Sequence, residues 1–217
     1  MPALAAAWAE SRELGVAVAV AVATGMRRGE VCGLRWVDVD LEAGSLRVVR
    51  NVVLVGGKVT AKDPKTHQAR RFSIDAGLVA VLAEHRAAMV ERARLAEVDL
   101  VDDAWVLSRS ADGSVPLYPD SVSKAWKRVA DAHGLAGMRL HDLRHLNATI
   151  QIDAGVPAST VAQRLGHATM ATTLRVYAHA VAARDQEAAD VIGRALDATK
   201  PPPGEGGGSD GDEGGGG

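Results

Sequence analysis

The alternation of apolar and polar positions predicts a mainly helical chain that contains one short stretch of β-strands. Alanine and valine crowd residues 3–22, and this pattern predicts two helical pieces broken at Gly15, the second running from about Leu14 to Ala23. The first piece begins in apolar sequence without a capping residue. Such a start is what we expect of a segment cut from a longer protein.

A β-branched, alternating stretch from Ser45 to Val55 predicts the first strand of an antiparallel sheet. Gly56 and Gly57 predict a hairpin turn, after which Lys58 begins a return strand. Residues 70–74 supply a third strand, and the loop before it is basic. We therefore expect one small three-stranded antiparallel sheet near the N-terminal third.

Helical periodicity then predicts a long helix from about Ala76 to Glu97, capped by Asp75. Its expected apolar stripe consists of Leu78, Val81, Leu82, Met89 and Leu95. Turn and capping residues delimit five further helices, expected at about 119–133, 141–153, 157–165, 169–178 and 180–198. The predicted fold class is α+β, mainly α-helical.

Residues 201–217 consist only of Pro, Gly, Ser, Asp and Glu. Such a segment cannot bury a core, so we expect a disordered tail after one domain over residues 1–200. The apolar run 16–23 is too short to span a bilayer, and the first ten residues do not resemble a signal peptide. We expect a soluble, cytoplasmic protein.

Composition limits the chemistry without identifying it. The chain has 217 residues, is 47% hydrophobic and holds a single cysteine, Cys32, which excludes an internal disulfide framework and a thiolate metal cluster. Its net charge is −2, although nucleic-acid-binding domains usually carry a basic excess. Four acidic residues lie in the tail, but the rest is still close to neutral. A DNA partner must therefore be argued from motifs.

The first motif is Thr-Gly-Met-Arg-Arg-Gly-Glu at residues 24–30. Gly25 can end a helix because it tolerates positive φ, which would place Arg27 in a tight turn between two buried helices. Glu30 lies three residues further on and could hold an arginine in place. Taken alone, the stretch is also typical of an exposed loop arginine beside a carboxylate at a helix N-terminus.

The second group of motifs lies between residues 139 and 179. His141, Arg144 and His145 should share one helix face, because residues three and four apart lie on the same side. His167 follows a helix-ending glycine, and Tyr177 is one of only two tyrosines. Singly, these features are typical of a solvated face, a helix cap and a half-buried core tyrosine.

Taken together and in this order, the motifs resemble the catalytic domain of the tyrosine recombinases, the phage integrase family. The resemblance covers residues 12–198 and adds Lys65 on the basic hairpin. It implies that Tyr177 attacks a DNA phosphate and becomes linked to the 3′ end. Arg27 and Arg144 would grip the nonbridging oxygens, for which a planar, permanently charged guanidinium is suited.

The resemblance also implies roles for the remaining residues. His141 would assist proton transfer from the tyrosine, His167 would donate to a phosphate oxygen, and Lys65 would protonate the leaving 5′ oxygen. Glu30 and His145 would support these groups. Physical chemistry agrees, because a tyrosine with a pKa of about 10 needs an acceptor or positive surroundings at neutral pH.

The reaction implied needs neither a metal, a cofactor nor ATP, and the sequence has no carboxylate cluster spaced for two metals. Fixed cations can stabilise the transition state in place of a metal. The partner implied is double-stranded DNA, bound by a homo-tetramer on paired sites. No small-molecule substrate and no membrane partner are expected.

The match departs from the family pattern in three places. Residues 146–149 differ from the usual sequence after the second histidine, Lys62 or Lys58 could replace Lys65, and the family's N-terminal DNA-binding domain is absent from the sequence. Three other interpretations remain open: a folded but inactive integrase remnant, a type IB topoisomerase, or a helix-turn-helix regulator. The last would use residues 153–167 to read DNA.

Overall fold

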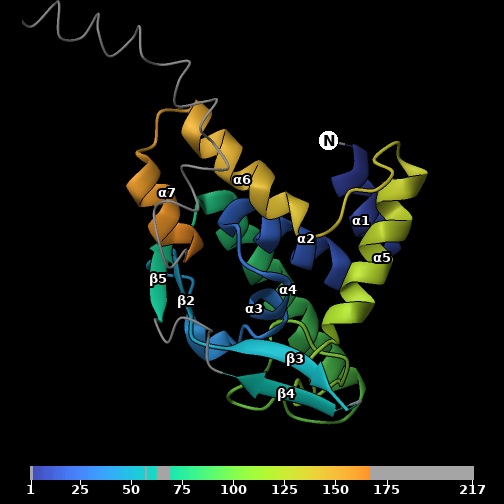
Figure 1. Cartoon of the computed structure of the whole chain (residues 1–217). Coiled ribbons are helices and arrows are strands. Elements are labelled where there is room, and N and C mark those ends of the chain that lie inside the picture. Colours follow the sequence, from blue (N-terminus) through green and yellow to red (C-terminus); the bar gives the residue numbers. More distant parts are fainter. Residues whose placement is uncertain (1, 57, 63–68, 167–217) are drawn as a thin grey trace, which may run out of the picture. The chain divides into compact units, whose positions relative to one another are not determined.

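The structure is a computed structural model, and it describes residues 2–56, 58–62 and 69–166. All of these residues lie in the first of the two units into which the chain divides, Met1–Tyr177. Figure 1 shows the arrangement of the elements. The helices within the described residues are α1 (Pro2–Glu10), α2 (Arg12–Thr24), α3 (Arg28–Cys32), α4 (Ala76–Leu95), α5 (Pro119–Ala132), α6 (Asp142–Asp153) and α7 (Ala158–Leu165). The strands are β1 (Val39–Asp40), β2 (Ser45–Val48), β3 (Asn51–Val55), β4 (Lys58–Lys62) and β5 (Arg70–Ser73).

The three-stranded antiparallel sheet is confirmed, but its strands differ from those expected. Strand β2 lies between β1 and β5, with Leu46 opposite Phe72, whereas β3 and β4 form a separate hairpin. The stretch expected as one strand therefore serves two sheets, with a break between β2 and β3. Arg50 lies at this break and pairs with the buried Asp38, an interaction that the alternation of apolar residues does not report.

The predicted break at Gly15 is wrong, because the first two helices separate at Ser11. The Ser11 hydroxyl accepts a hydrogen bond from the Leu14 amide at 3.1 Å and so caps α2. Gly15 lies inside α2, where a Cβ atom would come within 2.3 Å of the Trp8 side chain. This glycine therefore allows α1 to pack closely and does not interrupt the helix.

Helix α2 forms the centre of the core and packs against α1, α4, α5 and α6. Asp75 caps α4 as predicted, accepting from the Gly77 and Leu78 amides. The predicted stripe of α4 is wrong at Leu95, which is 69% exposed because the helix ends there, beyond the core. Its buried face instead includes His85, which is 1% exposed.

Helices α5, α6 and α7 occupy the predicted positions. Trp126 and Val129 of α5 are buried, as expected of core residues. Gly166 ends α7 in the left-handed conformation, with φ at +67°. The helices predicted at 169–178 and 180–198 and the tail lie outside the described residues. Within the described part, no helix is both long and apolar enough to cross a membrane.

Candidate active site

The turn after α2 brings three helices close to one backbone position. Gly25 caps α2 with φ at +65°, and its amide donates to the Ala21 carbonyl. A Cβ atom here would lie 2.4 Å from Leu165 Cδ2 and 2.8 Å from Asn147 Oδ1. Glycine is thus needed both for its left-handed backbone and for the close approach of α6 and α7.

Arg27 is the N-cap residue of α3, and Glu30 holds it through both the main chain and the side chain. Glu30 Oε2 accepts from the Arg27 amide at 2.8 Å, and Oε1 accepts from Arg27 Nη1 at 3.1 Å. The Glu30 side chain is only 2% exposed, whereas that of Arg27 is 40% exposed. The carboxylate therefore fixes the base of the guanidinium and leaves part of it facing solvent.

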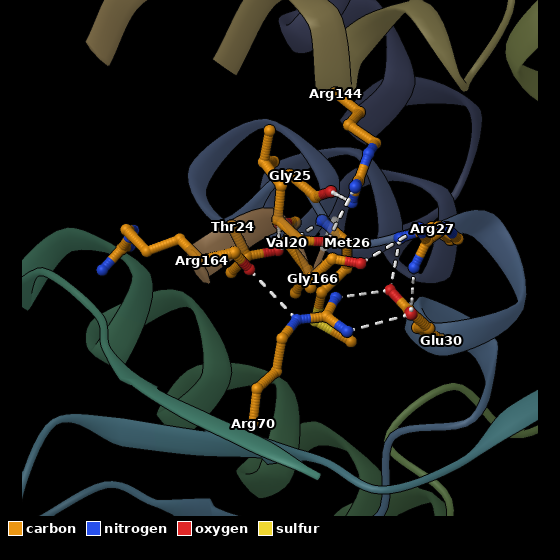
Figure 2. A network of polar contacts seen from close by, with 11 residues as sticks. Val20, Thr24, Gly25, Met26, Arg27, Glu30, Arg70, Arg144, Arg164 and Gly166 are labelled. Atoms are coloured by element: carbon orange, nitrogen blue, oxygen red, sulfur yellow. Dashed lines mark hydrogen bonds and ion pairs between the residues drawn. The ribbon is translucent and has the colours of Figure 1, made fainter. Parts of the chain in front are cut away.

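Arg70 of β5 pairs with the same carboxylate, and sequence reasoning assigned it no role in the site. Its Nη1 and Nη2 donate to Glu30 Oε1 and Oε2 at 3.0 and 2.6 Å, and its side chain is 9% exposed (Figure 2). Burial alone would raise the pKa of Glu30, but the pairs with Arg70 and Arg27 outweigh it and lower that pKa. Glu30 is thus an ionised carboxylate between two arginines.

The C-terminal end of α7 is the point on which the arginines converge (Figure 2). Three consecutive carbonyl oxygens, at residues 164–166, each accept from a different arginine, and a helix C-terminus favours such cations. The donors come from β5, α6 and the turn before α3. The pairs are Arg70 Nε with Arg164 O at 3.0 Å, Arg144 Nη2 with Leu165 O at 2.7 Å, and Arg27 Nη2 with Gly166 O at 3.3 Å.

The face expected to carry His141, Arg144 and His145 is divided. Arg144 is 4% exposed and also donates to the Gly25 carbonyl at 2.6 Å, so it points inward. The two histidines are exposed, and their rings meet edge to face with centroids 5.2 Å apart. Partial desolvation, followed by the positive neighbours His145 and Arg144, lowers the pKa of His141. The neutral imidazole, a proton acceptor, is therefore favoured.

Three of the predicted site residues, Lys65, His167 and Tyr177, lie outside the described residues. The structure therefore brings together Arg27, Glu30 and Arg144, with the two histidines at the start of α6, the helix that also carries Arg144. Arg70, which the sequence analysis placed only in a strand, completes the group. The signal that could have found it is its spacing, because it lies two residues before the buried Phe72 and so on the same side of the strand.

A cavity of about 840 Å³ opens beside this group, between α3, β3, α5 and the segment before α6. Arg27 and His141 line it, so it reaches the candidate site. Its other cationic lining residues are Arg28, Lys124, Lys127 and Arg139. No cluster of His, Cys, Asp or Glu in the described part of the chain could hold a metal ion. The carboxylates Glu30 and Asp120 also line it, so the five cations leave a net positive lining, which favours an anionic partner.

A comparison with models of known families decides the identity of this domain. The model described as the phage integrase family matches residues 3–184, which is most of the chain. The chain belongs to the phage integrase family. The match includes the whole of α6 and α7, so these helices are part of the family's domain. A separate helix-turn-helix regulator is not favoured.

Individual relatives agree with the family. The chain is 28% identical over 186 residues to a tyrosine recombinase XerC-like protein of Caldanaerobacter subterraneus subsp. tengcongensis, covering 80% of this chain and 47% of that protein. It is 30% identical over 174 residues to the ICEBs1 integrase of Bacillus subtilis, covering 80% and 46%. The chain therefore spans about half the length of these relatives.

Among solved structures, the Tn1549 transposon integrase in complex with transposon right end DNA is similar in fold. The TM-score is 0.67 at 19% sequence identity, over 85% of this chain and 59% of that chain. This similarity confirms the predicted fold class, a mainly helical domain with a small antiparallel sheet. The expected residue roles, the DNA partner and the assembly are taken up next as proposals.

Proposed function

We propose that this chain is the catalytic domain of a site-specific DNA recombinase that breaks and rejoins strands through a 3′-phosphotyrosyl intermediate. The Tyr177 oxygen attacks the scissile phosphorus, a tyrosine–phosphorus bond forms, and the bond from phosphorus to the 5′ oxygen breaks. The phenol loses one proton and the leaving 5′ oxygen gains one, so the step consumes no water and releases no net proton. The phosphodiester is exchanged and not hydrolysed, which allows rejoining without ATP or a metal.

One observation supports this proposal most strongly. Arg27 and Arg144, distant in the sequence, both donate to the last carbonyls of α7, immediately before His167. A phosphate near this point would meet the exposed part of the fixed Arg27 guanidinium, with the positive charge of the buried Arg144 close behind it. Such groups act on the charge that develops in the transition state and need no reorganisation during the step. The resemblance to the family implies that Tyr177 is the nucleophile, which would attack the phosphate bound by these arginines.

The remaining roles follow from the chemistry of each side chain. His141, whose pKa is lowered, accepts the proton of the tyrosine. His167 donates to a phosphate oxygen, and Lys65 protonates the leaving 5′ oxygen. Glu30 fixes Arg27, and His145 supports His141 through their edge-to-face contact.

We further propose that double-stranded DNA lies along the cavity beside Arg27, where Lys124 and Arg139 meet its phosphates. Recombination exchanges strands between two duplexes, so four active sites are needed. A homo-tetramer on paired sites provides them. The catalytic domain would occupy residues 1–200, with the Gly-rich, acidic residues 201–217 outside it.

The polarity of the adduct tests this function. The chain is mixed with a pool of random-sequence duplexes that carry single-strand nicks, so that the short fragment released by cleavage diffuses away. We expect a protein–DNA adduct on a denaturing gel that leaves a peptide on the 3′ phosphate after protease digestion. A peptide on the 5′ end would contradict the mechanism, and the absence of any adduct would indicate an inactive remnant.

A further inference from the structure

We propose that Arg70 is a positioning residue for strand cleavage, which holds Glu30 and the end of α7 in the arrangement that Arg27 needs. The inference deepens the proposed function and rests on it. Arg70 is not among the residues that line the cavity in the described part of the chain. Its contacts are with groups that themselves hold the two proposed phosphate-binding arginines.

The Arg70 guanidinium joins two parts of the site at once. Two of its nitrogens donate to the two oxygens of Glu30, and its third donates to the Arg164 carbonyl. The first pair fixes the carboxylate that holds Arg27. The last contact fixes the carbonyl next to those that accept from Arg144 and Arg27. Because one planar group makes all three hydrogen bonds, the distance between Glu30 and α7 is set by a rigid unit.

The surroundings of Arg70 show why arginine is needed at this position. A Cβ atom on Gly166 would come within 2.8 Å of Arg70 Nη1, so the helix end and the guanidinium are in close contact. Arg164 completes the contact from the other side, donating to the Ser73 carbonyl at 3.3 Å and lying over the Phe72 ring. A lysine ammonium is a compact point charge. It cannot donate three hydrogen bonds in the fixed, coplanar directions of a guanidinium.

Arg70 also lies in β5, the strand that follows residues 63–68 in the sequence. Its hydrogen bonds attach β5 to both Glu30 and α7. Loss of the guanidinium would release three components together: the base of Arg27, the end of α7 and the start of β5. The expected defect is in the chemical step and not in DNA affinity, because these contacts are hydrogen bonds within the protein and Arg70 is not among the described residues that line the cavity.

The test compares Arg70→Lys with Arg71→Lys in the full chain. Arg71 is the next residue of the same strand, is 58% exposed and contacts Asp40 and Ser45 on the opposite side. Both variants are mixed with the nicked duplex pool, and adduct formation is followed at saturating DNA. We expect Arg70→Lys to slow the step about tenfold or more. DNA affinity should stay within about twofold to threefold of the parent, and Arg71→Lys should match the parent in both.

A role in folding alone would give a different result. It would lower the fraction of active chains, seen as a smaller adduct amplitude, with an unchanged rate in those that react. If Arg70 acts through Glu30, the rates of Arg70→Lys, Glu30→Gln and the double variant should be non-additive. An unchanged rate in Arg70→Lys, or additive effects in this cycle, would overturn the inference.

Hydrogen exchange without DNA separates this inference from the proposed function. We expect faster amide exchange at residues 27–31 and 164–166 in Arg70→Lys and not in Arg71→Lys. If the parent chain forms no adduct, the proposed function fails. The exchange rates still test whether Arg70 holds Glu30 and the end of α7. Unchanged exchange at both segments would show that Arg70 does not hold them, whatever the cleavage assay gives.

Discussion

At the scale of single residues, Glu30 is held by four hydrogen bonds to two arginines. Both of its oxygens accept hydrogen bonds from Arg27 and Arg70, and its side chain is 2% exposed. Glu30→Gln keeps the size of the side chain but leaves two arginines without their counter-charge. We expect it to lower the free energy of unfolding by about 3–5 kcal/mol at neutral pH, measured by urea denaturation.

The pH dependence follows from the lowered pKa of Glu30. Its stabilising contribution is fully present above the unfolded-state pKa, near 4.5, and is lost as pH falls through the lower folded-state pKa. The difference between the parent and Glu30→Gln should therefore shrink on acidification below about pH 4.5. Glu91→Gln, at an exposed pair with Arg94, is the control and should change little. A difference that stays constant down to pH 3 would contradict this account.

His85 provides an independent pH prediction in the core. Its Nε2 contacts the Val106 carbonyl at 2.7 Å, and Nδ1 has no hydrogen-bond partner within the described part of the chain. Burial lowers the pKa of this histidine, so the unfolded state binds a proton more readily than the folded state. The stabilising contribution of the neutral His85 side chain is thus fully present above pH 6.5, the ordinary pKa of histidine, and is lost as pH falls below it. Urea denaturation between pH 7 and 5 should show a shallower decline in His85→Gln, and not in the exposed control His133→Gln.

Sequence reasoning identified residues by chemical type and spacing, and it missed residues whose role depends on partners. Arg27 and Glu30 were found because they lie in one short motif. Arg70 was not assigned a role because its partner, Glu30, is forty residues away. His85 was missed for the same reason. Nothing in the periodicity of α4 indicates that the Val106 carbonyl, 21 residues further along the chain, would contact it.

At the scale of elements, the glycine that ends α2 has two separable functions. Gly25→Ala must adopt positive φ and also meets Leu165 and Asn147. We expect a loss of about 2–5 kcal/mol, from about 1–2 for the left-handed backbone and about 1–3 for overpacking. Gly134→Ala is the matched control, because φ there is +77° and nothing lies within 4 Å. Urea denaturation should show a loss of only about 1–2 kcal/mol in the control. Equal losses in the two variants would contradict the proposed contact.

Helix boundaries were predictable where local chemistry fixes them. Gly25, Asp75 and Gly166 end or cap helices as their residue types predict. The strands were less predictable, because the pairing of β2 with β5 joins residues far apart and leaves β3 to pair with β4. Gly15 misled the prediction because the local pattern does not reveal that Trp8 packs against it.

At the scale of the whole molecule, the order of motifs along the chain predicted that distant residues would meet, and Arg27 and Arg144 do meet at α7. It did not predict how they meet, because the acceptors are backbone carbonyls, which carry no sequence signal. The cavity beside them was also not predictable, since its walls come from α3, β3 and α5 together. Net charge gave no indication of this net positive lining, because five of its residues are basic in a chain that is nearly neutral as a whole.

The proposed path of DNA along this cavity gives a salt-dependent prediction. Lys124→Gln removes an exposed cation from its lining. We expect weaker binding to duplexes of any sequence and a slope of log affinity against log salt that is smaller by about one. Arg94→Gln on α4, outside the cavity lining, should leave the slope unchanged. Equal slopes for the parent and Lys124→Gln would place the DNA elsewhere.

The central claim is that Tyr177 is the nucleophile of a pocket built around Arg27 and Arg144. Removal of the Tyr177 hydroxyl tests this claim most directly. Tyr177→Phe is compared with Tyr118→Phe, which changes the only other tyrosine and leaves the proposed site intact. Both are mixed with the nicked duplex pool and run on a denaturing gel. We expect a 3′-linked adduct with Tyr118→Phe and none with Tyr177→Phe, although both bind DNA. An adduct that survives Tyr177→Phe would contradict it.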